Sequence, residues 1–210
     1  EEYEKISDYI RDIARAKNGN YLVFFPSYAY MQSVFDVFSQ RELLKAGNGF
    51  EVHMQDNAMS ESARQEFLDF FQAGNHGTVL GFCVLGGIFS VGIDLKEDRL
   101  IGAIIVGTGL PQMGDERELL REFYDRKCSM GFEYAYLYPG MNKVLQAGGR
   151  VIRTEKDLGI IALLDERFNY RQYRSLFPRE WDPVVKVTRA TVVEKVNGFW
   201  ESCSESEDEG

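Results

Sequence analysis

The sequence predicts an α/β fold in which a parallel sheet is flanked by helices. Short apolar runs, such as residues 78–85 and 158–164, have the length and composition of buried strands. Between these runs, apolar residues recur every three or four positions, which is the period of an amphipathic helix. Strands that alternate with helices favour a parallel sheet, because each helix returns the chain to the starting edge.

The first elements are expected to be a helix, a buried strand and a second helix. An Asn-Gly-Asn turn at residues 18–20 ends the first helix, and the strand follows at residues 21–25. The apolar residues that share one helix face are Tyr3, Ile6, Ile10 and Ile13 in the first helix, and Met31, Val34, Phe35 and Phe38 in the second.

A short strand, a helix and a longer strand are expected next. The short strand spans residues 50–54, and the helix begins at Ser60 or Ser62, because Ser is a favoured helix N-cap. The longer strand covers residues 78–85. The apolar residues expected to point inward from the helix are Ala63, Phe67, Phe70 and Phe71.

The second half of the chain is expected to hold three more strands and several helices. The strands are placed at residues 101–107, 133–138 and 158–164, with helices around 115–127 and 141–150. Two later helical stripes consist of Tyr170, Tyr173, Leu176 and Phe177, and of Val192, Val193, Val196, Phe199 and Trp200. A base-stacking role for Tyr170 and Tyr173 is the alternative to this amphipathic packing, which is favoured by the spacing.

Composition and charge predict one domain at residues 1–200 and an acidic, disordered tail at 201–210. The chain has 210 residues, 44% of them hydrophobic, which is enough for a large core. The net charge is −9, but five acidic residues and no basic one lie in the last ten positions. Residues 143–174 hold seven basic and four acidic residues, so positive potential gathers there.

Several classes of protein and site are disfavoured by the composition. No apolar run is long enough to span a membrane, and no signal-peptide pattern opens the chain, so we expect a cytoplasmic protein without a membrane segment. Three scattered cysteines and two histidines lack the spacing of a metal site. Since the chain begins at Glu1 without a methionine, we expect it to be a piece of a longer protein.

The most informative stretch is residues 146–153, Gln-Ala-Gly-Gly-Arg-Val-Ile-Arg. Gln146, Arg150 and Arg153 are spaced at i, i+4 and i+7, which is one stripe of a helix. Guanidinium groups are planar five-donor forks that suit phosphate oxygens. A solvated helix face is the alternative for a lone Arg-x-x-Arg pair.

A glycine-punctuated loop follows the apolar run at residues 78–85. Gly86, Gly87 and Gly92 allow the backbone to turn tightly and approach a ligand, and Asp94 places a carboxylate just beyond them. Taken alone, this loop is equally compatible with a purely structural turn.

Together these segments resemble motifs V and VI of superfamily 2 helicases, in the XPD/DinG branch. Gly92-Ile-Asp94 resembles motif V, and Gln146 with Gly149, Arg150 and Arg153 resembles motif VI. Residues 19–27 look like motif IV, and the likeness continues through residues 138–145 and 158–168. The resemblance covers residues 1–200 and implies the RecA-like, P-loop NTPase type of fold, as the second helicase domain.

The resemblance implies that ATP and Mg²⁺ bind between this domain and an N-terminal helicase domain of the same protein. Arg150 and Arg153 would be arginine fingers on the γ-phosphate, and Gln146 would position the nucleotide or the attacking water. Gly92 and Asp94 would link the nucleotide to the DNA track, while Ser27 and Tyr28 would contact single-stranded DNA. The implied function is that of a DNA-repair type of helicase moving 5′ to 3′.

Two further features limit what this segment can do alone. No Gly-x-x-x-x-Gly-Lys-Ser/Thr loop is present, so the isolated segment is expected to be inactive as an ATPase. Intact members of the branch commonly carry an iron–sulfur cluster held by four thiolates, which the cysteines of this segment cannot supply. The apolar run ending at Asp165 and Glu166 is interpreted as a strand end and not as a metal-binding pair.

One departure from the motif leaves an alternative open. Family members usually have Glu before the Gly-Ile-Asp of motif V, whereas this chain has Val91, which removes a hydrogen-bond acceptor. The alternative function is a non-catalytic nucleic-acid-binding or interaction module derived from the helicase fold.

Overall fold

The computed structural model contains one five-stranded sheet in which every pair of neighbouring strands is parallel. The order is β2-β3-β1-β4-β5, so the first strand of the chain lies in the centre. The strands are β1 (Asn20–Phe25), β2 (Phe50–Met54), β3 (Thr78–Val84), β4 (Gly102–Val106) and β5 (Ile160–Leu164). The structure describes residues 1–45, 47, 49–89, 100–152 and 157–208, with only the backbone described for 205–208.

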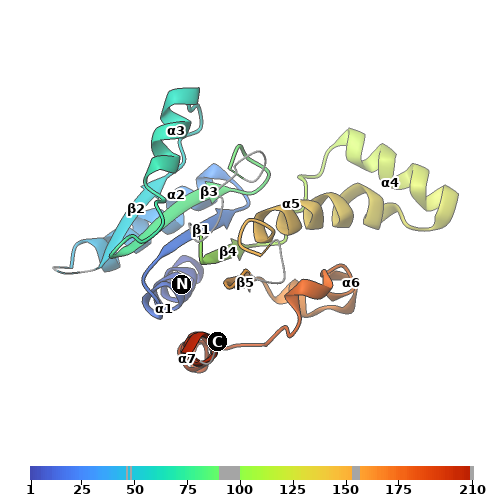
Figure 1. Cartoon of the computed structure of the whole chain (residues 1–210). Helices are drawn as coiled ribbons and strands as arrows, with labels where there is room; N and C mark the ends of the chain where they lie inside the picture. Colours follow the sequence, from blue (N-terminus) through green and yellow to red (C-terminus); the bar gives the residue numbers. More distant parts are fainter. Residues whose placement is uncertain (46, 48, 90–99, 153–156, 209–210) are drawn as a thin grey trace.

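Helices cover both faces of the sheet (Figure 1). One face packs against α1 (Glu2–Arg15), α2 (Tyr28–Phe38) and α7 (Val192–Asp208). The other face packs against α3 (Glu61–Asp69), α5 (Tyr138–Gly148) and the short turns of residues 166–181. The predicted parallel sheet with flanking helices is therefore confirmed, and this architecture is that of the RecA-like fold.

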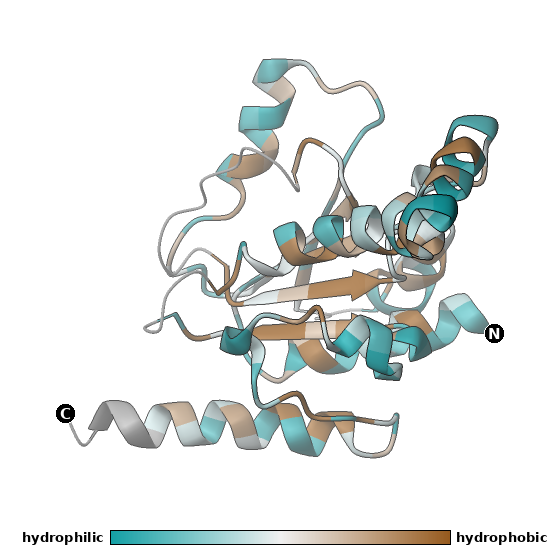
Figure 2. Ribbon diagram, turned by 90° about the vertical axis from the view of Figure 1, so that its right-hand side faces the viewer, coloured by the Kyte–Doolittle hydropathy of each residue, from teal (hydrophilic) through white to brown (hydrophobic). Residues whose placement is uncertain are grey.

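The three central strands are buried along their whole length, which explains why the sequence shows them as continuous apolar runs. Successive residues point to opposite faces, so Phe82 packs with Phe25 and Phe38 on one side, while Cys83 joins the core on the other. In Figure 2 the strands are the most uniformly hydrophobic part of the ribbon, whereas hydrophilic and hydrophobic residues alternate along the helices.

The strand predicted at residues 133–138 is wrong, because this segment is helical. A π-helix, η2 (Glu133–Leu137), leads directly into α5, and Ala135, Tyr136 and Leu137 are buried, with Leu137 in the core against the sheet. Tyr134 is exposed and stacks on Tyr124 of α4 (Asp115–Cys128), with ring centroids 4.1 Å apart, and the hydroxyl of Tyr136 donates to Glu118 of the same helix. Because both sides of the segment carry aromatic residues, their alternation in the sequence imitated a strand.

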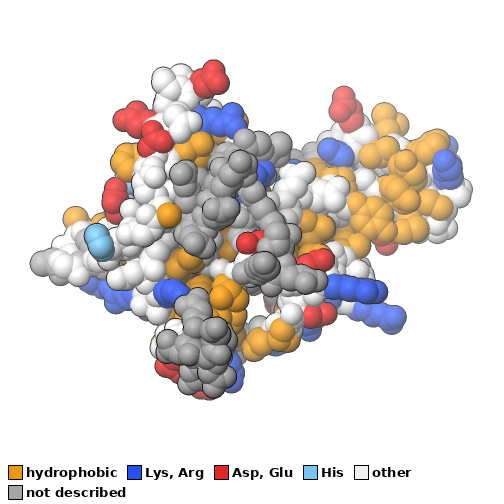
Figure 3. Space-filling view, viewed as in Figure 1, with side chains coloured by type: hydrophobic (Ala, Val, Ile, Leu, Met, Phe, Trp, Pro, Cys, Tyr) orange, Lys and Arg blue, Asp and Glu red, His pale blue; other side chains and the backbone are white. Residues whose placement is uncertain are grey.

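Helix α4 projects from the sheet together with α5 (Figure 1) and contains no buried residue. Figure 3 shows hydrophobic side chains gathered over this end of the molecule, where Leu119 and Phe123 of α4 are exposed. The helix ends at Cys128 and is capped by Ser129, whose φ of +56° is a left-handed conformation.

Three smaller predictions also need correction. Phe70 was expected to point inward, but α3 ends at Asp69 and the Phe70 ring is exposed, stacked 3.5 Å from the ring of His53. The stripe that begins at Tyr170 forms only one turn of helix, α6 (Arg171–Arg174). The tail predicted to be disordered from residue 201 is helical up to Asp208, because α7 continues through it.

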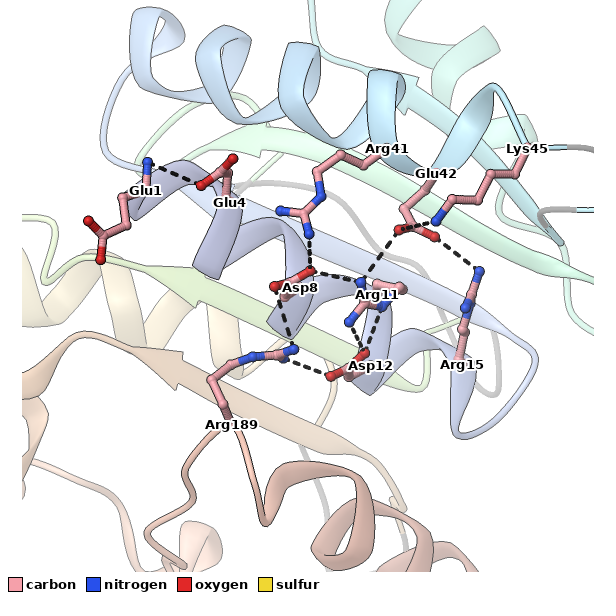
Figure 4. Close-up of polar contacts among 10 residues, drawn as sticks. All are labelled: Glu1, Glu4, Asp8, Arg11, Asp12, Arg15, Arg41, Glu42, Lys45 and Arg189. Atoms are coloured by element: carbon pink, nitrogen blue, oxygen red, sulfur yellow. Dashed lines mark hydrogen bonds and ion pairs between the residues drawn. The ribbon is translucent and has the colours of Figure 1, made fainter.

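A network of ion pairs holds α1 to its neighbours (Figure 4). Glu42, in the π-helix η1 (Ser39–Leu43) that extends α2, is almost fully buried and lies within ion-pair distance of Arg11, Arg15 and Lys45. Arg189, just before α7, pairs with Asp8 and Asp12 of α1.

Among the helices that the structure describes, none is long and apolar enough to cross a membrane.

Candidate functional site

The residues predicted to contact DNA lie where β1 ends and α2 begins, at the carboxyl edge of the sheet. Ser27 is the N-cap of α2, and its Oγ accepts a hydrogen bond of 3.2 Å from the backbone N–H of Tyr30. Tyr28 is the first residue of the helix and is half-buried. Burial, with smaller contributions from Cys83 and Asp56, raises the pKa of the Tyr28 hydroxyl above its ordinary value.

The glycine loop begins beside this junction, because β3 is the neighbour of β1. The backbone N–H of Leu85 donates to the carbonyl of Phe25 at 2.8 Å, so the two strand ends are joined. Gly86 has a φ of +74°, a left-handed conformation that favours glycine. Phe89 is buried with its ring 4.3 Å from that of Phe67, which anchors the start of the loop. The later predicted residues of this loop, Val91, Gly92 and Asp94, lie outside the described residues.

The arginine motif lies at the end of α5 and not along one helical stripe. Gln146 is exposed in the last turn of the helix, which ends at Gly148. Arg150 is half-buried in the following turn, where its backbone N–H donates to the carbonyl of Ala147 at 3.3 Å. The expected helical spacing is therefore interrupted between Gln146 and Arg150. Arg153 lies outside the described residues.

The last residue of α5 is closely packed. An added Cβ at Gly148 would lie 2.4 Å from Cζ2 of Trp181, so only glycine fits between the helix and the turn that covers it. Gly149 then has ψ near 0°, and the chain turns toward β5. Arg150 lies in this turn, just beyond the close contact between Gly148 and Trp181.

Lys143 is a site residue whose position the sequence did not predict. Its aliphatic stem lies against Gly86, where an added Cβ would be 3.0 Å from Lys143 Cδ, and against Gly109 after β4. Gly140, one turn earlier in α5, packs on the carbonyl of Thr108. The only sequence signal was that Lys143 belongs to the basic segment 143–174. The helix that carries Gln146 is thus packed against the ends of both β3 and β4.

The pair Asp165 and Glu166 was interpreted as a strand end, and the contacts of Asp165 agree. Both carboxylate oxygens of Asp165 accept from the guanidinium of Arg167, at 2.9 and 2.6 Å, and Oδ1 also accepts from the Arg167 backbone N–H. The described residues contain no cluster of three His, Cys, Asp or Glu that could hold a metal ion.

Comparison with known proteins identifies the family of this fold and motif arrangement. The family described as helicase C-terminal domain matches residues 10–184. The chain is a helicase C-terminal domain. As part of superfamily 2, it is related to the XPD helicases and to regulator of telomere elongation helicase 1.

Three relatives illustrate how much of a helicase this domain represents. Regulator of telomere elongation helicase 1 of Mus musculus is 30% identical over 193 residues, covering 85% of this chain and 16% of the relative. The general transcription and DNA repair factor IIH helicase subunit XPD of Dictyostelium discoideum is 29% identical, covering 75% and 21%. The probable ATP-dependent helicase MJ0942 of Methanocaldococcus jannaschii is 26% identical, covering 79% and 26%.

Solved structures of XPD helicases share the fold. An apo XPD structure superimposes with a TM-score of 0.61 at 25% identity, covering 82% of this chain and 33% of that one. A second XPD helicase structure gives a TM-score of 0.60 at 24% identity, with 82% and 29% covered. This helicase C-terminal domain therefore spans about a third or less of the relatives it matches.

Proposed function

We propose that this domain is the C-terminal motor domain of an ATP-dependent DNA helicase. In this proposal, ATP binds with Mg²⁺ between this domain and an N-terminal helicase domain of the same protein. The observation that carries the proposal is the meeting of three segments at one edge of the sheet: the β1–α2 junction, the end of β3 and helix α5. The first segment carries Ser27 and Tyr28, the second leads in the sequence to Gly92 and Asp94, and the third carries Gln146 and leads to Arg150.

Arg150 and Arg153 are proposed to act on the γ-phosphate, and Gln146 to position the nucleotide or the attacking water. Phosphoryl transfer leaves little covalent chemistry to the protein, so charge placement supplies most of the rate enhancement. The exposed position of Gln146 at the end of α5 supports this proposal, because a neighbouring domain can reach its amide.

Ser27 and Tyr28 are proposed to contact single-stranded DNA. They lie at the N-terminus of α2, where the helix dipole favours a negatively charged phosphate. Gly92 and Asp94 are proposed to connect this contact to the nucleotide. Closure and opening of the two domains would then move the strand stepwise, in the 5′ to 3′ direction that the family resemblance implies. An iron–sulfur cluster, if the intact protein holds one, belongs to another part of it.

The test is the Arg150→Ala variant of the intact helicase. DNA-stimulated ATP hydrolysis should fall by about 10³-fold or more, since a finger acts on transition-state charge. The affinity for single-stranded oligo(dT), measured by fluorescence anisotropy, should change little. Arg171→Ala, which removes an exposed arginine of α6, is the matched control and should leave both quantities unchanged.

Two outcomes would contradict the proposal. If Arg150→Ala lost oligo(dT) affinity in proportion to ATPase, Arg150 would be a DNA-phosphate contact. If the unmodified protein bound oligo(dT) but showed no DNA-stimulated ATPase, the domain would be the non-catalytic binding module. The melting temperature of each variant, measured alongside, separates both outcomes from unfolding, because Arg150 is half-buried.

A further inference from the structure

We propose that Gln55 is a positioning residue that joins the DNA-contacting turn at Ser27 and Tyr28 to the end of β3. Gln55 directly follows β2 at the carboxyl edge of the sheet and is only 2% exposed. This inference rests on the proposed function, since it describes how the two ends of that site are coupled.

The side-chain amide of Gln55 connects two different segments of the chain. Its Nε2 donates a hydrogen bond of 2.7 Å to the hydroxyl of Tyr28, and its Oε1 accepts a bond of 3.0 Å from the backbone N–H of Val84. The backbone N–H of Gln55 donates to the carbonyl of Phe82 at 2.8 Å, which extends the pairing of β2 with β3. One residue thus joins the ends of β2 and β3 and the first residue of α2.

The glycine turn after β3 is also built around this amide. An added Cβ at Gly87 would lie 3.3 Å from Gln55 Nε2 and 3.0 Å from the carbonyl of Val84. The backbone N–H of Gly87 donates to that same carbonyl at 3.0 Å. The turn that leads toward Gly92 and Asp94 therefore starts in contact with the side chain that holds Tyr28.

The direction of the hydrogen bond gives Tyr28 a defined chemical role. A phenolic hydroxyl can accept and donate, and here a lone pair of the oxygen accepts from Gln55, an amide NH₂ that can only donate. The hydroxyl proton of Tyr28 can then be directed to an acceptor. A phosphate oxygen of a single strand is an acceptor of this kind.

Burial of an amide at this position costs free energy unless each of its polar atoms has a hydrogen-bond partner. An apolar side chain of the same size would leave the buried N–H of Val84 without this acceptor and would release the Tyr28 hydroxyl. A movement of the turn at residues 86–89 that displaces Val84 would shift the amide, and with it Tyr28. Gln55 is accordingly expected to transmit a movement of this turn, caused by the nucleotide, to the contact between Tyr28 and DNA.

The experiment compares Gln55→Leu with Asn20→Leu in the intact helicase. Asn20 is the matched control, since it is a buried amide at the opposite end of β1. Its Nδ2 donates to the carbonyl of Gln72, and its Oδ1 accepts from Asn75, both at 2.9 Å. Both substitutions should lower the melting temperature, because each removes a satisfied buried amide.

Only Gln55→Leu should change the interaction with DNA. We expect its dissociation constant for oligo(dT), measured without nucleotide, to rise by about fivefold to tenfold. The factor by which DNA stimulates ATP hydrolysis should fall, while DNA-independent hydrolysis stays within about twofold of the unmodified protein. Gln55→Glu should weaken binding at least as much as Gln55→Leu, because a carboxylate still accepts from the Val84 N–H but takes the Tyr28 hydroxyl proton that the phosphate needs.

A double-mutant cycle with Tyr28→Phe completes the test. If Gln55 acts through Tyr28, the double variant should bind oligo(dT) no more weakly than Tyr28→Phe alone. Equal oligo(dT) affinity for Gln55→Leu and the unmodified protein, or equal losses for Gln55→Leu and Asn20→Leu, would overturn the inference. Absence of DNA-stimulated ATPase in the unmodified protein would instead contradict the proposed function, and the affinity measurements would still decide the role of Gln55.

Discussion

The aliphatic stem of Lys143 lies against the backbone of Gly86, so α5 is in direct contact with the turn that follows β3. A Cβ at position 86 would come within 3.0 to 3.3 Å of three side-chain carbons of Lys143. Gly86 and Lys143 are more than fifty residues apart in the sequence. Their contact places the helix that ends at the arginine motif beside the start of the glycine loop.

This contact predicts a specific effect of Gly86→Ala. Gly86 and Gly74 have nearly the same φ, +74° and +75°, but an added Cβ at Gly74 would meet no atom within 4 Å. Both substitutions to Ala should cost about 1–2 kcal/mol of unfolding free energy, because a left-handed backbone strains an L-residue. Only Gly86→Ala should also lower DNA-stimulated ATPase in the intact helicase, since it displaces Lys143. Equal activity of the two variants would contradict a functional role for this contact.

The two serine N-caps provide a second prediction. Ser27 caps α2 and Ser60 caps α3, and each Oγ accepts from a backbone N–H at 3.2 Å. Replacement of either by Ala should lower the unfolding free energy by about 1 kcal/mol, which corresponds to a melting temperature lower by about 2–4 °C for a chain of this size. Oligo(dT) affinity should fall for Ser27→Ala alone. If Ser60→Ala weakened binding as much, the loss would reflect stability and not a contact with DNA.

Removing the charge of the buried carboxylate of Glu42 should lower the unfolding free energy more than removing the charge of an exposed carboxylate. Glu42 is 1% exposed and has three cationic partners, of which Arg15 and Lys45 are about half-exposed. Glu42→Gln should lower the unfolding free energy by about 2 kcal/mol. This loss is smaller than that expected on breaking a fully buried ion pair, because solvent screens these partners. Glu194→Gln, which removes a carboxylate of an exposed pair with Lys195, should have no measurable effect. Urea unfolding of both variants tests this difference.

Burial of Cys83 predicts a loss of stability at alkaline pH. The thiol is fully buried in β3, and desolvation raises its pKa well above the ordinary value. Because the folded-state pKa lies above the unfolded value of about 8.5, this contribution to stability is complete below that pH and is lost as the pH rises. Cys83→Ala should therefore show a shallower fall of unfolding free energy between pH 7.5 and pH 10. Cys128→Ala, at an exposed cysteine, should keep the original slope.

Most of the secondary structure could be predicted from the sequence. The five strands of the sheet lie within about two residues of their predicted positions, and the three central ones are fully buried strands that appear as apolar runs bounded by turns. Residues 133–138 were the exception, because Tyr134 and Tyr136 both contact α4 while Leu137 joins the core against the sheet. The alternating aromatic residues of this segment therefore belong to a helix and not to a strand.

The sequence by itself was enough to locate the strands, to predict a parallel sheet and to identify the family, because these depend on local periodicity and on motifs a few residues long. Only the tertiary structure decided that β1 lies between β3 and β4, that Lys143 meets Gly86, and that the helix stops at Gly148 before Arg150. It also decided that Gln55 is buried with its amide between Tyr28 and Val84. Such contacts join residues that are far apart in the chain, so they depend on how whole elements pack and leave no periodic trace in the sequence.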